Sequence, residues 1–373
     1  MRVLITNTRL EGRGGTETFV RQLARGLQAQ GHSAIAYGSD PQELPRLLES
    51  DVIPVATDLE HLPFRPDIIH AQHHLDAMTA ITALPGVPAI YHCHGAIWRE
   101  SVPRHPRIYH YLAVSSTLKD RMSVEFLVPP SDISVVLNGV DMRRFRPRTQ
   151  PPPARLARAL VYNSRHDANS PTVKAIREAT EPRGIQLDFV GTRFGRLVDA
   201  PEALLPSYDV VFASGLSAIE AMASGCAVVV LGRTSCGELV RPDNFDRCRR
   251  ANFTIAVNSP EPCACAIGAE LDRYVPADTA AVSERARREA DFDRMVDALV
   301  PIYQQAIARN ASTAPDLTAE VLATSRYLRG IVPLIKMTDR MLNAQWSSPT
   351  RATTLEELRA DLEMLRQKVD GRA

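Results

Sequence analysis

Residues 215–231 read GLSAIEAMASGCAVVVL. Gly215 and Ser217 open a short helix, Gly225 ends it, and the apolar run that follows predicts a buried parallel strand. The first N–H groups of a helix lack intrahelical partners and carry partial positive charge, so the helix start suits an anion such as a diphosphate. Glu220 comes about one turn later, on the face that reaches a ribose hydroxyl of such a ligand. The plainer interpretation is a glycine-capped core helix with one partly exposed acid.

The composition is that of an ordinary globular chain. Of 373 residues, 45% are hydrophobic and 23% are charged, and the length favours two domains with an accessory segment. A formal net charge of +1 excludes a strong general attraction to nucleic acid. No apolar run reaches the length of a transmembrane helix, and the first residues predict a strand rather than a signal peptide. We therefore expect a cytoplasmic enzyme.

The chain has six cysteines, at positions 93, 226, 236, 248, 263 and 265, and none is in a C-x-x-C pair. Such sparse cysteines predict reduced thiols, several of them buried, and no metal site. Cys93 stands between His92 and His94, which admits a metal-binding interpretation. We favour a buried strand end with neighbouring imidazoles.

A pair of glycines precedes the first predicted helix. Residues 3–6 predict a strand, and the helix that begins after Gly14-Gly15 leads into a second strand. Two glycines at a helix start permit close approach of the backbone to a ligand. Residues 13–18, RGGTET, do not complete G-x-G-x-x-G, so we expect no NAD site although Asp40 follows the second strand.

Several histidines stand at predicted strand ends. Apolar runs predict further strands at 52–55, 67–70, 89–92, 111–114 and 134–137. Ligands of open parallel sheets bind outside the carboxyl ends of the strands. The histidines at two such ends are His70, His73, His74, His92 and His94. They predict a polar cleft, with His94 as the residue that contacts a ligand.

A proline-rich segment predicts the division of the chain. Residues 148–153 read RTQPPP, typical of a stiff linker, and the strand–helix alternation then repeats up to a helix near 291–309. The expected fold class is α/β, with two Rossmann-like domains facing across a cleft and a C-terminal helical extension. The expected boundaries are 1–147 for the first domain, 148–158 for the linker, 159–311 for the second domain and 312–373 for the extension.

The tail shows no strand pattern. Its apolar residues step by three and four, and Pro333 within the first run predicts the start or a kink of a helix. Capping-box patterns begin at Thr353 and at Thr354, so a last helix is expected there. Its heptad seam spans about two and a half repeats, fewer than a coiled coil usually needs. Packing against the body and self-association are both open.

Four short sequence motifs occur in a characteristic order along the chain. They are GGTE at 14–17 with the helix to Gly31, HG at 94–95, NGVD at 138–141 with FRP at 145–147, and the stretch at 215–231. Together they resemble a GT-B glycosyltransferase of the retaining kind often called family 4. The resemblance covers about residues 1–309 and leaves the tail outside.

This resemblance implies a nucleotide-sugar donor held mainly by the second domain, with the acceptor against the first. It implies that Glu220 binds the nucleotide ribose and that Arg165 neutralises the diphosphate, whose charge grows as it leaves. The other donor-binding residues that it implies are Gly14, Gly15, Gly215, Leu216 and Ser217. Arg165 and His94 are the expected catalytic residues.

Two positions depart from the family pattern. The family has a second acid eight residues before the ribose-binding one, and Phe212 stands there. The family lysine about five residues after the arginine is replaced by Ser170, with Lys174 the nearest lysine. Lys174, reaching back, and Arg193, after a strand end, are therefore further expected phosphate ligands.

The leading hypothesis is an active, divergent glycosyltransferase that needs no metal and no cofactor beyond the nucleotide-diphosphate sugar as co-substrate. A second hypothesis is a catalytically degenerate GT-B subunit that binds a nucleotide sugar or serves as a scaffold. A sugar-nucleotide epimerase would need more acid–base residues in the cleft than the sequence offers.

The expected acceptor is a glycan or a glycolipid, and no nucleic-acid partner is expected. A basic run at 99–107 raises the hypothesis of peripheral contact with the inner face of the membrane. The C-terminal helices raise that of a homo-oligomer.

Overall fold

The computed structural model describes residues 1–10, 14–39, 53–232, 234–255 and 263–346. The chain divides into two compact units, Met1–Pro315 and Asp316–Ala373. In the described part of the chain, no helix combines the length and the apolar character that crossing a membrane requires. Arg13, Asp40 and the helix expected from Thr353 onward lie outside the described residues.

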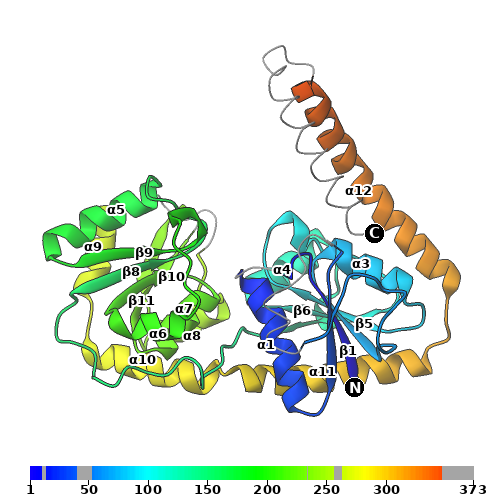
Figure 1. Ribbon diagram of the computed structural model, residues 1–373, viewed down its shortest axis with the longest axis horizontal. Coiled ribbons are helices and arrows are strands. Elements are labelled where there is room, and N and C mark those ends of the chain that lie inside the picture. The colour runs from blue at the N-terminus through cyan, green and yellow to red at the C-terminus, as the bar shows by residue number, and fades with distance from the viewer. Residues whose placement is uncertain (11–13, 40–52, 233, 256–262, 347–373) are drawn as a thin grey trace, which may run out of the picture. The chain divides into compact units, whose positions relative to one another are not determined.

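The first unit contains two sheets, and the first of these is parallel (Figure 1). Its seven strands follow the order β3-β2-β1-β4-β5-β6-β7. Their bounds are Arg2–Thr6 for β1, Ser33–Tyr37 for β2, Val55–Ala56 for β3, Ile68–Ala71 for β4, Ala89–Cys93 for β5, Ile108–Ala113 for β6 and Ile133–Val135 for β7. In the central strand β1, Ile5 pairs with Ala36 on one side and with His70 on the other. Four of its five residues are buried, because a parallel sheet is covered on both faces.

Helices connect the strands of this sheet. They are α1 (Gly15–Ala29), α3 (His74–Ala83) and α4 (Ser116–Glu125), with short turns η1 (Trp98–Glu100) and η2 (Pro130–Asp132). α1 buries Phe19, Leu23 and Leu27 at helical spacing, as predicted. α4 begins where a serine predicted it, because Ser115 Oγ accepts a hydrogen bond from the Leu118 N–H at 3.2 Å.

The second sheet has five strands in the order β12-β11-β10-β8-β9. They are β8 (Arg158–Tyr162), β9 (Gln186–Val190), β10 (Val210–Ala213), β11 (Ala227–Leu231) and the antiparallel edge strand β12 (Cys236–Leu239). The helices around it are α5 (Pro171–Thr180), α6 (Pro201–Leu204), α7 (Leu216–Ala223), α8 (Phe245–Arg250), α9 (Ala264–Asp272) and α10 (Pro276–Glu289). Three short turns complete it, η3 (Glu181–Arg183), η4 (Thr192–Phe194) and η5 (Leu205–Ser207).

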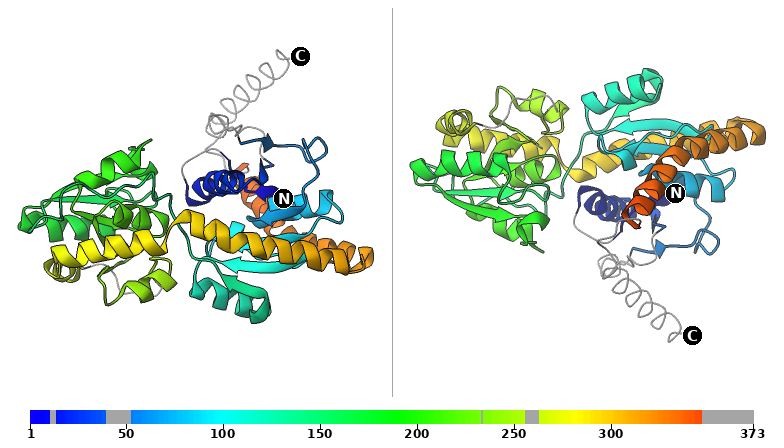
Figure 2. Two further views of the ribbon diagram at one scale, coloured as in Figure 1. Left: turned by 90° about the horizontal axis from the view of Figure 1, so that it is seen from below. Right: turned by 90° about the horizontal axis from the view of Figure 1, so that it is seen from above.

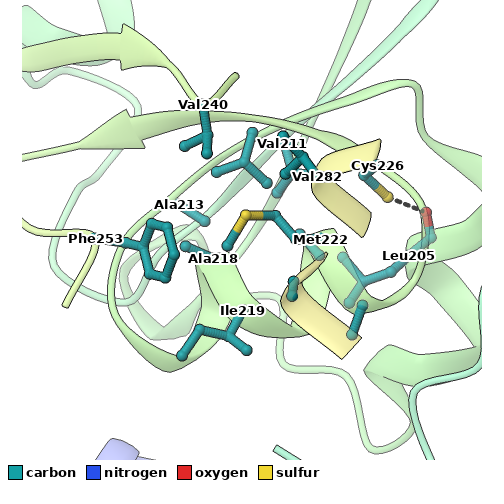
Figure 3. Packing of buried hydrophobic residues seen from close by; sticks show 14 of the residues in the cluster. Leu205, Val211, Ala213, Ala218, Ile219, Met222, Cys226, Val240, Phe253 and Val282 are labelled. Atoms are coloured by element: carbon teal, nitrogen blue, oxygen red, sulfur yellow. Dashed lines mark hydrogen bonds between the residues drawn. The ribbon is translucent and has the colours of Figure 1, made fainter. Parts of the chain in front are cut away.

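The stretch 215–231 forms the predicted helix and strand. Gly225 has φ +87° after the last turn of α7, and every residue of β11 is buried. The apolar side chains of α7 lie in the core beside β10, where Met222 and Ile219 meet Phe253 and neighbouring aliphatic residues (Figure 3). This packing fixes the direction of α7 and therefore the position of its N-terminus.

The chain passes between the two sheets earlier than the proline-rich segment indicated. Val140, Met142 and Phe145 are buried in the core of the second sheet, although we expected the first domain to extend to residue 147. At the crossing, the Val140 N–H donates to the Ala290 carbonyl at 2.9 Å, and the Phe292 N–H donates to Val140 at 3.1 Å. A Cβ on Gly139 would stand 2.9 Å from the Asp291 carbonyl oxygen, so only glycine permits this close crossing.

The helix expected to close the second domain packs on the first sheet instead. Figure 2 shows α11 (Phe292–Ser312) running along that sheet, where Val296, Leu299 and Tyr303 are fully buried. A Cβ on Gly26 of α1 would stand only 2.7 Å from Cγ2 of Val296. An amphipathic stripe predicts that a helix is covered but not by which sheet, which is why the sequence left α11 in the wrong half.

The tail is helical where it is described. α12 (Leu317–Trp346) is one helix with Pro333 inside it, so no helix begins at that proline. The helical prediction for the tail is confirmed for these residues.

One pair of cysteines corrects the expectation of reduced thiols throughout. Cys263 and Cys265 form a disulfide, and their Cα atoms are 5.4 Å apart, within the range that a disulfide bridges. Two cysteines separated by one residue match no motif, so the sequence pattern gave no signal. The other four are free, and Cys93, Cys226 and Cys248 are buried.

Candidate functional site

A cavity lies between the start of α1 and the start of α7. It is lined by Gly15, Thr18 and Arg21 of α1, by Leu216, Ser217 and Glu220 of α7, and by Arg144, Tyr162, Val198, Asp199 and Pro201. Four of the residues expected to bind a donor, Gly15, Leu216, Ser217 and Glu220, are thus brought together. Gly14 is the N-cap of α1, one residue outside the lining.

Two helix N-termini meet at this cavity. Gly215 has φ +58° and ψ −131°, a conformation that glycine adopts without strain, and this turn directs α7 from β10 toward the cavity. A Cβ on Gly15 would stand 3.7 Å from Leu216 Cδ1, so the two helices begin almost in contact. Their first N–H groups have no carbonyl one turn earlier, and Arg21 and Arg144 add two charges. The helix starts and the two guanidinium groups therefore suit an anion, while Asp199 and Glu220 add two acids to the same lining.

Glu220 is buried at the cavity wall. The Tyr162 hydroxyl donates a hydrogen bond to Glu220 Oε2 at 3.0 Å. Burial raises the pKa of Glu220 to about 7, against the opposing effects of the Tyr162 hydrogen bond and the Arg144 charge. The plainer interpretation of a partly exposed acid is wrong, because only 7% of the residue is exposed.

Arg144 is held in place at the cavity by an ion pair. Its guanidinium lies 2.8 Å from Glu202 and stacks over the ring of Phe145 at 5.2 Å. Burial disfavours the charge on Arg144, but the hydrogen bond and charge of Glu202 outweigh it and raise the pKa of Arg144. A positive charge is thereby fixed on the side of the cavity that faces Glu220.

We expect the stability of the protein to depend on pH through Glu220. Its folded-state pKa of about 7 lies above the ordinary glutamate pKa of 4.5, so the carboxyl group stabilises the fold fully below pH 4.5, and this stability is lost as the pH rises to about 7. Urea unfolding should show wild type losing about 3 kcal/mol relative to Glu220→Gln between these pH values. A difference between the two proteins that stays constant with pH would contradict the shift.

Three expected phosphate ligands lie outside the cavity lining. Arg165 follows β8 and is exposed, with its backbone N–H bonded to Asn163 Oδ1 at 2.7 Å. Arg193 lies in η4 with 63% of its side chain exposed, 4.0 Å from Asp167. Lys174 is exposed on α5. Arg165 and Arg193 nevertheless follow adjacent strands at the same carboxyl edge as α7, the edge where ligands of such sheets bind.

The histidines of the first sheet gather at its carboxyl edge, but they form a buried cluster rather than an open cleft. His70, His73, His74 and His92 are at most 3% exposed. His94 is half-buried, with its ring 4.1 Å from that of His92 and 4.5 Å from that of Phe19. Burial lowers the pKa of His70, His92 and His94 well below the usual value, so these imidazoles are neutral.

Glu100 braces the turn that carries His94. Glu100 Oε2 accepts the His94 backbone N–H at 2.9 Å, and Oε1 lies 3.3 Å from His73 Nε2. Burial alone would raise the pKa of Glu100, but its side-chain bond to His73 and the backbone N–H of His94 lower it. His73 itself has φ +55°, a conformation that costs a non-glycine residue energy and persists because its neighbours hold it.

The two departures from the family pattern have structural roles. Phe212 is fully buried in β10 and packs in a core cluster with Ile176 of α5 and Ile267 of α9. The buried side chains of α7 belong to a different cluster. Ser170 is the N-cap of α5, where its Oγ accepts the Val173 N–H at 3.4 Å. Neither side chain lines the cavity.

The basic run at 99–107 is not a continuous surface patch. Arg107 is buried, and its guanidinium donates to the carbonyls of Leu84 and Val87 at 2.7 and 2.9 Å. His105 is also buried. A basic side chain that satisfies buried carbonyls is indistinguishable in sequence from one that faces solvent.

Sequence reasoning missed five polar residues of the cavity, Thr18, Arg21, Arg144, Tyr162 and Asp199. Thr18 and Arg21 follow Gly15 at intervals of three, so helical spacing places them on one face. Tyr162 stands at the carboxyl end of a predicted strand, which is itself a signal for a ligand-facing side chain. Arg144 lies between the two motif pieces at 138–141 and 145–147.

Comparison with known proteins agrees with this geometry. Residues 13–144 match the family model described as Glycosyltransferase Family 4. A glycosyltransferase from Rickettsia africae ESF-5 is similar in structure, with a TM-score of 0.58 and 14% identity over 82% of this chain and 98% of that one. The resemblance to GT-B glycosyltransferases of family 4 is confirmed.

Two further GT-B structures are similar. AviGT4, a glycosyltransferase involved in avilamycin A biosynthesis, has a TM-score of 0.53 and 16% identity over 82% of this chain and 98% of its own. WaaG, a glycosyltransferase involved in lipopolysaccharide biosynthesis, has a TM-score of 0.51 and 12% identity over 81% and 99%. No curated protein matches the chain in sequence. The fold is therefore GT-B, and family and fold together support a glycosyltransferase function.

Proposed function

We propose that the chain transfers a hexosyl group from a nucleotide-diphosphate sugar to a glycan or glycolipid acceptor, with retention of configuration and without a metal or a further cofactor. The observation that carries this proposal is the cavity where two helix N-termini, Arg21 and Arg144 surround Glu220. A diphosphate suits the helix ends and the guanidinium groups, and a ribose suits the acid one turn along α7.

In this proposal, transfer breaks the bond between the anomeric carbon and the diphosphate oxygen and forms a bond to an acceptor hydroxyl oxygen. The acceptor proton leaves with the nucleoside diphosphate, which gains negative charge as it departs. The starts of α1 and α7 with Arg144 stabilise that charge, joined by Arg165, Arg193 and Lys174 at the edge of the second sheet. His94 contacts the donor sugar from the first sheet.

Replacing Glu220 by alanine should weaken the binding of the correct nucleotide by about 1–3 kcal/mol, because ribose hydroxyls lose their acceptor. A thermal-shift panel of UDP, GDP, ADP, dTDP and CMP, with several of their sugars, identifies the nucleotide, and calorimetry then measures affinity. Glu284→Ala, at an exposed position on α10, is the control and should bind as wild type does. Equal affinity of Glu220→Ala and wild type would refute the ribose assignment.

A catalytically degenerate subunit is the second candidate function, favoured by Phe212 and Ser170 at the positions of the family acid and lysine. It predicts nucleotide binding without turnover. Release of the nucleoside diphosphate in the presence of an acceptor mixture, abolished in Glu220→Ala, would exclude it. A thermal shift with one nucleotide sugar but no release would support it.

We further propose that the C-terminal helices mediate self-association and that the chain, in a cytoplasmic location, makes peripheral contact with the inner face of the membrane. α12 exposes apolar side chains, among them Leu328, Ile335 and Met337. If the helices self-associate, truncation after Ser312 should reduce the number of chains per particle, as measured by light scattering. Nucleotide affinity should stay unchanged in the truncated protein, and sedimentation of the full chain with anionic vesicles tests the membrane contact.

A further inference from the structure

Three histidine side chains meet at the carboxyl edge of the first sheet. His70 belongs to β4, His92 to β5, and His94 follows β5 directly. One ring nitrogen of each lies within 4.8 Å of the other two. His92 Nδ1 is 3.3 Å from His70 Nε2, the separation of two nitrogens that share a tetrahedral ion at about 2.1 Å each. A tetrahedral ion requires a nitrogen of His94 to approach the other two to about the same separation.

Two of these imidazoles have a buried nitrogen without a partner. Within the part of the chain that the structure describes, Nε2 of His92 and Nε2 of His94 make no hydrogen bond and are inaccessible to solvent. A buried polar atom left unsatisfied costs free energy, so native proteins rarely keep two in one cluster. The single contact between His92 and His70 leaves the cluster with fewer hydrogen bonds than its ring nitrogens require.

The surroundings hold the rings as a metal site requires. The Tyr303 hydroxyl lies 2.6 Å from His70 Nδ1, which leaves Nε2 of that ring directed at His92. Histidine ligands usually bond their second nitrogen in this way, and the bond fixes the ring orientation and the tautomer. Phe19 packs edge-on against His92 and His94, with centroids 5.1 and 4.5 Å apart.

We propose that His70, His92 and His94 bind a divalent transition-metal ion, with zinc the natural occupant. Three imidazoles and an open fourth position are a common zinc donor set, and imidazole also suits copper and nickel but not magnesium or calcium. With His70 bound through Nε2 and His92 through Nδ1, coordination by His94 through Nε2 gives that atom the partner that a purely structural stack of imidazoles denies it.

This ion is an inhibitor of transfer rather than its cofactor, an inference that rests on the proposed function. His94 is the residue assigned to the donor sugar, and coordination occupies its Nε2. Zinc should therefore compete with the sugar portion of the donor and leave the affinity for the free nucleoside diphosphate unchanged.

The test uses the full chain, freed of metal with a chelator and titrated with Co²⁺ alone. Wild type should bind one Co²⁺ per chain, with the visible absorption of tetrahedral nitrogen coordination, and zinc should displace it. His94→Gln should weaken this binding about 100-fold. His110→Gln, on β6 and outside the cluster, should bind as wild type does. Absence of the absorption in wild type, or equal binding by His94→Gln, would overturn the proposal.

Thermal unfolding provides a second measurement. Zinc should raise the melting temperature of wild type and His110→Gln but not that of His94→Gln, because a ligand of the folded state alone stabilises it. His94 is half-buried, so this variant is expected to fold, and its melting temperature without metal verifies that. An equal rise in all three proteins would assign zinc to another site and overturn the proposal.

The two proposals fail separately. Cobalt binding by a chain that responds to no nucleotide would support the metal site and overturn the proposed transfer. A nucleotide response that depends on Glu220, in a chain that binds no Co²⁺, would do the reverse.

Discussion

Replacing Gly191 by alanine is expected to lower the free energy of unfolding by about 3–5 kcal/mol. Gly191 follows β9 with φ +152°, and a Cβ there would stand 2.0 Å from the Asn163 carbonyl oxygen. That oxygen belongs to the backbone beyond β8, so the loops that carry Arg165 and Arg193 must separate to admit the methyl group. Urea unfolding measures the loss, and the melting-temperature shift with nucleotide should shrink because the edge of the second sheet is displaced.

Gly195 is the matched control for this substitution. It lies in the same loop, also has positive φ at +67°, and has nothing within 4 Å of a built Cβ. Gly195→Ala should therefore cost only the left-handed conformation, about 1–2 kcal/mol. If both variants lost the same stability, steric contact with Asn163 would not be the cause.

Replacing Glu100 by alanine is expected to cost about 3–5 kcal/mol, as removal of one member of a buried, hydrogen-bonded pair typically does. The substitution leaves His73 Nε2 and the His94 N–H without their acceptor. Since His73 keeps a strained conformation, the loss of its partner should also release that turn. Chemical denaturation measures the stability, and proteolysis near residues 94–100 should accelerate.

Two variants give this result its meaning. Glu100→Gln keeps the size of the side chain and an acceptor oxygen, so it should lose less than half as much stability as Glu100→Ala. Glu125→Ala removes an exposed carboxylate from its pair with Arg121 and should cost less than about 1 kcal/mol. A Glu100→Ala protein as stable as Glu125→Ala would show that Glu100 does not stabilise the turn at His94.

The architecture was predictable because it depends on short-range patterns. An apolar run such as residues 227–231 predicts a buried strand, and a glycine such as Gly225 predicts the end of a helix. The structure has both. The destination of α11 was not predictable, because its apolar stripe fits any open sheet face. The disulfide between Cys263 and Cys265 was not predictable, because two cysteines separated by one residue match no motif.

The candidate site divides along the same line. Leu216, Ser217 and Glu220 could be predicted because they lie on one helix, at its N-terminus and about one turn after it. Arg144 and Tyr162 come from other elements, and only tertiary packing brings their side chains to Glu220. The histidines were predicted to gather, but their burial depends on Phe19 and Tyr303, which stand far away in the sequence.

The crossing at Gly139 and Asp291 has a consequence for synthesis. The first sheet is covered by α11, so residues 140–290 interrupt a folding unit whose two parts are distant in the chain. A ribosome completes all seven strands of that sheet before it has made the helix that buries them. The N-terminal sheet is therefore the first to be translated and the last to be finished, and a fragment ending at residue 147 lacks part of its own core.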